Sequence, residues 1–211
     1  MSIICPTVTP TTPDPHEYRE QLERVEQIAP RIQLDFMDGE FARPRSTNLA
    51  QAWWRDGLTV DIHLMYQRPL DYIETLVSLQ PSLIIIHSEA DGDLAGMLTH
   101  LQSLGIKSGI ALLPDTSVNS VKNLIEIADH VLIFAGSLGT FGGHADLAQL
   151  TKVPQIRAIK PEIEIGWDGG ANADNIRTLA DAGVDVINAG SAIQHAENPL
   201  EAYQHLKQLI S

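Results

Sequence analysis

Residues 82–89 read SLIIIHSE, in which four apolar residues are followed by His87 and Glu89. A continuous apolar run of this length is typical of a strand covered on both faces, as in a parallel sheet. Seven other runs share this pattern, and they are residues 2–9, 31–38, 58–65, 107–114, 130–137, 162–169 and 184–191. We therefore predict eight strands.

Helical patterns alternate with these runs. Residues 15–29, for example, place Leu22, Val25 and Ile28 at helical spacing. Further helices are expected near 46–55, 69–79, 92–104, 117–128, 144–160, 172–182 and 198–210. Strict alternation of this kind implies parallel strands joined by right-handed crossovers.

An open doubly wound sheet and a closed barrel both fit that alternation. Eight strand–helix units account for the chain, and no linker, low-complexity tract or shift in composition indicates a second domain. The sequence therefore predicts an α/β protein with a single (β/α)8 TIM-barrel domain over residues 1–211.

Charge and composition narrow the partners. The net charge is −13 and no cluster of Lys or Arg stands out, so we expect neither nucleic acid nor an anionic membrane as a partner. The amino-terminal residues lack the features of a signal peptide, and no window approaches the roughly 20 apolar residues of a membrane span. The single cysteine, Cys5, excludes an internal disulfide and is expected to be buried. These features favour a cytoplasmic protein.

Polar residues follow several of the apolar runs at the point where each run ends. In a barrel the carboxyl ends of the strands share one face, and that face carries the active site. The residues are Asp35 and Asp38, His63, His87 and Glu89, Asp168 with Gly169 and Gly170, and Gly190 with Ser191. Chance could produce one or two such ends, but five strands with the same feature indicate a functional site.

Asp35 and Asp168 are the candidate acid/base pair. They would come from the second and seventh strands and face one cavity from different sides. One carboxylate can then remove a proton from a substrate carbon while the other returns a proton from the far side, which inverts that centre. A single strand-end Asp is more often a helix cap or the partner of a surface Lys, but two on one face beside His63 favour catalysis.

His63 adds a possible metal ligand. A single His on a strand is more often a buried core residue than a ligand, yet here it accompanies two carboxylates. Imidazole and carboxylate oxygen together suit zinc, iron, manganese or cobalt. A divalent ion at this place would act as a Lewis acid and stabilise an enediolate.

Glycine-rich segments after the last three strands indicate a phosphate site. Glycine lets the backbone approach a ligand and expose its N–H groups, and barrels often hold phosphate with the loops after strands seven and eight. Each segment alone could be an ordinary turn. The residues concerned are Thr140, Phe141, Gly142 and Gly143, then Gly169 and Gly170, then Gly190 and Ser191.

Five motifs resemble those of the ribulose-phosphate 3-epimerase family, namely DFMDG (35–39), DIHLM (61–65), FGG (141–143), DGG (168–170) and AGSAI (189–193). The similarity extends from Cys5-Pro6-Thr7 to the last helix. Related decarboxylases and synthases carry Asp-x-Lys-x-x-Asp in the third strand, where this chain has Asp61, His63 and Tyr66. The resemblance therefore favours the epimerase branch of the ribulose-phosphate-binding barrels.

The resemblance implies conversion of D-ribulose 5-phosphate to D-xylulose 5-phosphate, with a phosphorylated sugar as the substrate. It implies Asp35 and Asp168 as acid/base residues and Asp35, His63 and Asp168 as ligands of a divalent metal ion. It also implies that Met37 and Met65 flank the reacting carbon and that Thr7 supplies a hydroxyl to the substrate. We further expect a homo-oligomer.

The departures from the family pattern lie around the sugar and the metal. Gln33 stands where the family has a ligand His, and an amide oxygen is a weaker ligand for zinc or iron. Ala135 replaces a family Met, and the loops 41–46 and 138–144 diverge. Arg43 or Arg45 is either part of a lid over the anion or a solvated surface residue.

These departures leave two alternatives open. One is an epimerase or isomerase for another phosphorylated sugar. The other is a phosphosugar-binding barrel that has lost metal-dependent turnover.

Overall fold

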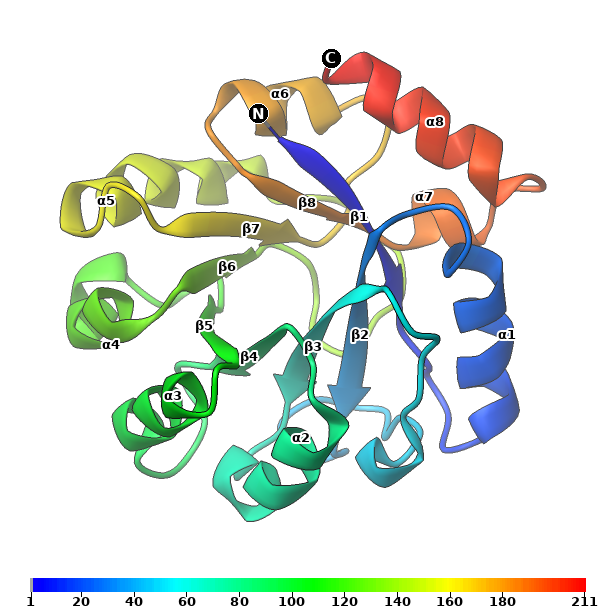
Figure 1. The fold of residues 1–211 in the computed structure, drawn as a ribbon. Coiled ribbons are helices and arrows are strands. Elements are labelled where there is room, and N and C mark those ends of the chain that lie inside the picture. The colour runs from blue at the N-terminus through cyan, green and yellow to red at the C-terminus, as the bar shows by residue number, and fades with distance from the viewer. Residues whose placement is uncertain (1) are drawn as a thin grey trace.

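The structure is a computed structural model that describes residues 2–211. Within them, eight parallel strands close into a barrel in sequence order, with β1 paired to β8 (Figure 1). The strands are β1 (Ile3–Val8), β2 (Arg31–Met37), β3 (Thr59–Met65), β4 (Leu83–His87), β5 (Lys107–Leu112), β6 (His130–Phe134), β7 (Glu164–Asp168) and β8 (Val186–Ala189). Each lies inside one of the predicted runs, so the predicted barrel is confirmed.

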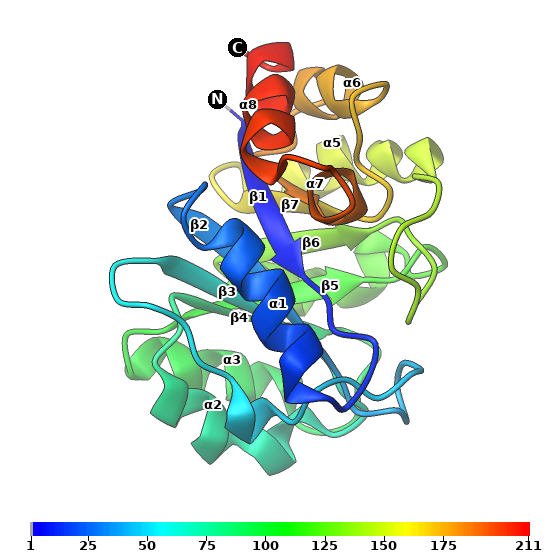
Figure 2. The same ribbon diagram turned by 90° about the vertical axis from the view of Figure 1, so that its right-hand side faces the viewer.

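Helices surround the barrel (Figures 1 and 2). The α-helices are α1 (Pro15–Val25), α2 (Ile73–Leu79), α3 (Leu94–Ser103), α4 (Lys122–Ile127), α5 (Lys152–Ile159), α6 (Ile176–Asp181), α7 (Ser191–Gln194) and α8 (Pro199–Leu209). Short 3-10 helices lie at Leu49–Gln51, Pro69–Tyr72, Val118–Val121 and Leu147–Thr151. None of the helices within residues 2–211 is long and apolar enough to cross a membrane.

The helix predicted near residues 46–55 is wrong. Only the 3-10 turn Leu49–Gln51 forms there, and the backbone is extended at Ala52. The hydroxyl of Tyr18, on α1, accepts from the Trp53 N–H and donates to the Trp53 carbonyl. Because a tertiary contact uses both backbone groups of Trp53, the segment follows the surface of α1 instead of continuing as a helix.

Helix α7 was not predicted, because its residues were assigned to the end of the eighth run and its loop. It begins directly after Gly190 and lasts only from Ser191 to Gln194. The turn thereby brings Gly190 and Ser191 to the mouth of the barrel.

The core has two layers, and β4 shows why its sequence is apolar throughout. Ile84 and Ile86 belong to the layer between barrel and helices, whereas Leu83 and Ile85 pack inside the barrel. Since side chains alternate along a strand, His87 continues the inward row of Leu83 and Ile85. The same alternation turns polar residues of β2 and β3 inward.

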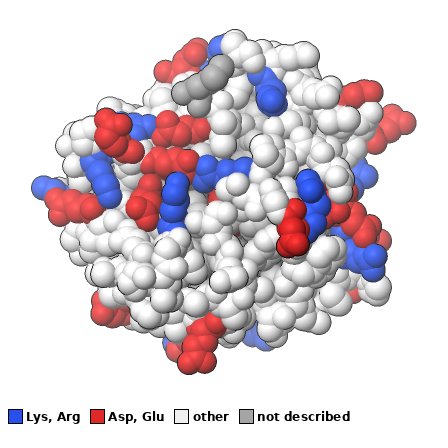
Figure 3. Space-filling view, in the orientation of Figure 1, with Lys and Arg blue, Asp and Glu red and all other residues white. Residues whose placement is uncertain are grey.

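Cys5 is fully buried, as expected, and its sulfur is free. On the face seen in Figure 3, acidic and basic side chains are interspersed. That distribution agrees with the absence of a basic cluster in the sequence.

Candidate active site

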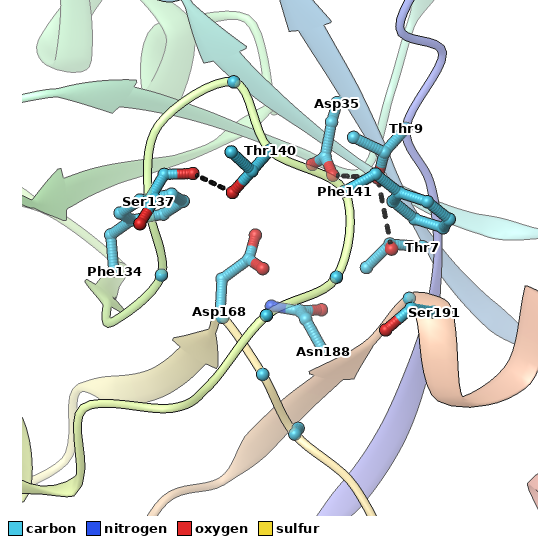
Figure 4. Close-up of a pocket in the computed structure, with 18 of the residues that line it drawn as sticks. Thr7, Thr9, Asp35, Phe134, Ser137, Thr140, Phe141, Asp168, Asn188 and Ser191 are labelled. Atoms are coloured by element: carbon cyan, nitrogen blue, oxygen red, sulfur yellow. Dashed lines mark hydrogen bonds between the residues drawn. The ribbon is translucent and has the colours of Figure 1, made fainter.

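A pocket opens at the carboxyl ends of the strands. Residues from β1, β2, β3, β6, β7 and β8 line it, together with residues that follow β1, β6, β7 and β8. In Figure 4, Asp35 and Asp168 lie between Phe134 and Ser137 on one side and Phe141 and Ser191 on the other. The pocket is therefore built at the face where the sequence placed the site.

The structure brings nearly all the predicted site residues to this pocket. Those that line it are Thr7, Asp35, Met37, Met65, Thr140, Phe141, Gly142, Gly143, Asp168, Gly169, Gly170, Gly190 and Ser191. The remaining two, Gln33 and His63, are fully buried and contact both carboxylates from below.

Asp35 and Asp168 are held by the same two nitrogen groups. Gln33 Nε2 donates to Asp35 Oδ1 at 2.8 Å and to Asp168 Oδ2 at 2.7 Å. His63 Nδ1 lies 3.3 Å from Asp35 Oδ1 and 3.4 Å from Asp168 Oδ2. The register of β2 against β3 makes Asp35 and His63 direct neighbours, whereas Asp168 reaches the cluster from β7.

The electrostatics of this cluster shift the pKa values of Asp168 and His63. Burial and the charge of Asp35 raise the pKa of Asp168. Burial would lower the pKa of His63, but its hydrogen bonds to Asp168 and Asp35 and their charges raise it to about 9. Without a metal ion, His63 is therefore protonated at neutral pH and offsets part of the negative charge between the carboxylates.

The glycine segments bring backbone close to the pocket. Gly169 has φ 121°, and a Cβ there would lie 2.2 Å from the backbone nitrogen of Gly136. A Cβ on Gly190 would lie 2.5 Å from Thr7 Oγ1 and 3.0 Å from the ring of Phe141. Both positions exclude larger residues, and their N–H groups are suited to an anionic ligand.

Comparison with known proteins agrees with these motifs. The model of the ribulose-phosphate 3 epimerase family matches residues 4–194. The chain belongs to this family. It is 31% identical over 192 residues to a protein named ribulose-phosphate 3-epimerase from Helicobacter pylori, covering 85% of this chain and 88% of that protein. The protein of that name from Schizosaccharomyces pombe is 29% identical over 187 residues, with 85% and 81% covered.

Among solved structures, KGPDC from Streptococcus mutans superposes with a TM-score of 0.76 at 12% identity, covering 99% of this chain and 98% of that protein. At that identity the likeness supports the fold alone. The predicted resemblance to the epimerase family is confirmed, and the predicted enzyme class, an isomerase, is the class of that family.

The residues of this epimerase family member fit a divalent ion. Ligand atoms of Asp35, His63 and Asp168 all lie within 4.8 Å of one another. Gln33 Oε1 is buried and has no hydrogen-bond partner within residues 2–211. Rotation of the amide would exchange Nε2 for Oε1 beside the carboxylates. Two carboxylates, an imidazole and an amide oxygen are then a suitable ligand set.

Two polar residues of the pocket, Thr9 and Asn188, are not among the site residues predicted from the sequence. Thr9 Oγ1 donates to Asp35 Oδ2 at 2.6 Å, and Thr7 Oγ1 lies 3.3 Å from Thr9 Oγ1. Asn188 is buried and lines the pocket, and both polar atoms of its side chain lack a partner within residues 2–211. The available signal was spacing, because Thr9 is two residues after Thr7 and Asn188 two residues before Gly190.

A small apolar cluster closes the side of the pocket near β2 and β3. It consists of Met37, Ala42 and Met65, with Phe41 and Leu138 packed against them. The two methionines occupy the pocket wall, where the resemblance expected them.

Arg43 and Arg45 are exposed and lie outside the described lining of the pocket. Arg45 Nε donates to the Asp38 carbonyl. This arrangement agrees with the surface role, and it gives no support to a lid of arginines.

Proposed function

We propose that this protein is a sugar-phosphate 3-epimerase whose simplest substrate pair is D-ribulose 5-phosphate and D-xylulose 5-phosphate. The observation that carries the proposal is the pair Asp35 and Asp168, which line one pocket from β2 and β7 and share the Gln33 and His63 nitrogens. Family membership supports the same activity.

In the proposed mechanism the phosphate binds to backbone N–H groups of the loops after β6, β7 and β8. The sugar then extends towards the two carboxylates. For one epimer, Asp35 removes the C3 proton and Asp168 delivers a proton from the other side, and for the other epimer the roles reverse. The raised pKa of Asp168 suits it to hold the proton that is delivered.

When bound, a divalent ion supplies Lewis-acid stabilisation of the negative charge that develops on the substrate oxygens. We propose Asp35, His63, Asp168 and, after rotation of its amide, Gln33 as its ligands. Met37 and Met65 present apolar surface beside the sugar and keep water from the deprotonated carbon. Thr9 holds one oxygen of Asp35, so that the other carboxylate oxygen stays in place for its role at the site.

A coupled assay with D-ribulose 5-phosphate in deuterated water tests the proposal. We expect turnover together with incorporation of deuterium at C3, because the returned proton comes from a carboxyl group that exchanges with solvent. Turnover of a different phosphorylated pentose or hexose, without turnover of D-ribulose 5-phosphate, would show that the same mechanism acts on another substrate. Tight binding of phosphosugars with no turnover and no exchange would instead indicate a binding protein.

We also propose that residues 1–211 act as one domain in the cytoplasm and assemble as a homo-oligomer. Limited proteolysis, cell fractionation and light scattering measure these three properties. A smaller stable fragment, an exported protein or a monomer would each contradict the corresponding part.

A further inference from the structure

A row of polar side chains extends from His63 at the pocket floor through His87 on β4 to Glu89 in the loop after β4. His63 Nε2 lies 2.9 Å from His87 Nε2, and His87 Nδ1 lies 3.4 Å from Glu89 Oε2. Both imidazoles are fully buried, and Glu89 is partly buried. His87 and Glu89 take no part in the mechanism described above.

Glu89, at the far end of the row, acts as a hydrogen-bond acceptor. Glu89 Oε1 accepts from the Leu113 N–H at 3.0 Å and from the Thr116 hydroxyl. Leu113 and Thr116 lie in the loop after β5, and His87 lies on β4. Burial raises the pKa of Glu89, but hydrogen bonding from these three residues favours its ionised form and lowers the pKa to about 2. An ionised carboxylate only accepts hydrogen bonds. Glu89 Oε2 and His87 Nδ1 lie 3.4 Å apart, and both atoms are buried without a hydrogen-bond partner within residues 2–211. Each is therefore the available partner of the other, and their pairing requires a proton on His87 Nδ1.

That requirement passes along the row to His63. A neutral imidazole has one N–H, so a proton on His87 Nδ1 leaves His87 Nε2 as an acceptor. The contact between the two Nε2 atoms needs one proton, and His63 Nε2 must supply it. In the metal-free protein His63 Nδ1, between Asp35 and Asp168, also carries a proton. Because Nε2 keeps its proton, a divalent ion would displace the one on Nδ1 and meet the Nδ1 lone pair.

We propose that Glu89 and His87 are positioning residues that fix the tautomer of His63 and so direct its Nδ1 lone pair at a divalent ion. The inference deepens the proposed function, because it concerns the metal site of that same reaction. Outer partners of this kind commonly orient a ligand imidazole and increase its basicity.

Aromatic rings lie against His87 at the middle of the row. The ring of Phe41 lies 4.7 Å from that of His87, and the ring of Phe134 lies 5.9 Å from it. These aromatic groups cover the imidazole on the pocket side. Glu89 itself is partly exposed and lines a second hollow, so a side chain of equal size is needed to test its role without admitting water.

Glu89→Gln is a sharp test because it keeps the shape and reverses the polarity. The Gln oxygen must still accept from Leu113 and Thr116, which turns the amide NH2 towards His87 Nδ1. His87 Nδ1 must then accept a hydrogen bond, so His87 carries its proton on Nε2. His63 Nε2 must accept from it, which leaves the proton of His63 on Nδ1, where the ligand lone pair is needed. Glu89→Asp keeps an acceptor and is expected to retain part of the effect.

The measurement is Co²⁺ affinity of the full-length protein after dialysis, followed by visible absorption. We expect Glu89→Gln to weaken binding roughly 10- to 100-fold, the range found for changes in outer partners of metal ligands. The matched control is Glu40→Gln, which removes an exposed carboxylate paired with Arg68 and should leave affinity unchanged.

A second readout needs no variant. Nitrogen-15 chemical shifts of the histidines in the metal-free wild-type protein should show His87 protonated on Nδ1 and bare on Nε2. The inference is overturned if His87 carries its proton on Nε2, if the wild-type protein binds no Co²⁺, or if Glu89→Gln binds Co²⁺ within about 2-fold of wild type, well below that range. Failure of the proposed epimerase is a separate result, because it appears as absent turnover in a protein whose Co²⁺ binding and tautomer are as expected.

Discussion

The two ends of the barrel use similar residues for opposite purposes. At the amino end, Arg31 Nε lies 2.8 Å from Asp61 Oδ2, and its two terminal nitrogens donate to Glu164 at 2.8 Å each. His130 Nδ1 lies 2.8 Å from the same carboxylate. Burial would raise the pKa of Glu164, but hydrogen bonds from Arg31 and His130 hold it well below its usual range. At this end the permanent positive charge of Arg31 therefore neutralises buried and partly buried carboxylates.

At the carboxyl end, two carboxylates and a buried His form a comparable cluster, yet no Arg or Lys is among the residues that line the pocket within residues 2–211. The charge is instead offset by Gln33 N–H groups and a protonated His63. The comparison shows two uses of buried carboxylates. Where an Arg neutralises them permanently, the cluster stabilises the fold. Where no Arg or Lys is present, the carboxylates remain available to bind a ligand or a proton.

The largest expected effect separates the acids of the two ends. Asp35→Asn and Asp168→Asn should each lower kcat/KM by about 10²–10⁴, because each removes one group of the acid/base pair. Phosphosugar binding should remain measurable by calorimetry, since the phosphate is assigned to other loops. Asp61→Asn is the matched control and should lower stability more than turnover. An Asp35 or Asp168 variant within a few-fold of wild type would remove that residue from the mechanism.

The next effect is on stability at the amino end. Arg31→Met leaves Asp61 buried without its cation, and breaking a buried ion pair in this way costs about 3–5 kcal/mol. Asp61 has only 2% of its side chain exposed, so solvent cannot replace the lost partner. Urea unfolding measures the change, and Arg19→Met, in an exposed pair, should leave the midpoint unaltered. An unchanged midpoint in Arg31→Met would contradict the structural role of this end.

A smaller effect concerns the phosphate loops. Gly190→Val places side-chain atoms against Thr7 and Phe141 and should block the backbone from a phosphate. Loss of one charge-assisted hydrogen bond should weaken all phosphosugars together by roughly 10- to 100-fold. Titration calorimetry with paired sugars and sugar phosphates measures this, and unphosphorylated sugars should bind far more weakly to the wild-type protein. Equal affinity for ribulose and ribulose 5-phosphate would show that the phosphate assignment is wrong.

The smallest effect sharpens the role of Gln33. Gln33→His adds an imidazole ligand beside Asp35 and Asp168, and we expect at least about 10-fold tighter metal retention, a change at least as large as outer partners produce. Elemental analysis after dialysis against a chelator measures it, with Gln33→Leu as the variant that offers no ligand. Stoichiometric zinc or iron in the wild-type protein after a strong chelator would contradict a weakened site.

Much of the site was predictable because side chains alternate along a strand and strands of a parallel barrel end at one face. That rule predicts one face for Asp35, His63 and Asp168, and the structure brings their ligand atoms within 4.8 Å of one another. It missed Thr9 and Asn188, since a polar residue in an apolar run does not reveal its partner. It also assigned no role to His87 and Glu89.

The sequence by itself determined the eight strands, their parallel order and the face that carries the polar residues, because these follow from periodicities of two and 3.6 residues within short segments. Only the tertiary structure decided which polar atoms meet. Gln33 donates a hydrogen bond to Asp168, 135 positions further along the chain. The hydrogen bond between Tyr18 and the Trp53 backbone takes the place of a helix predicted in that segment. Such contacts depend on closure of the barrel and on side-chain rotamers, which local patterns do not encode.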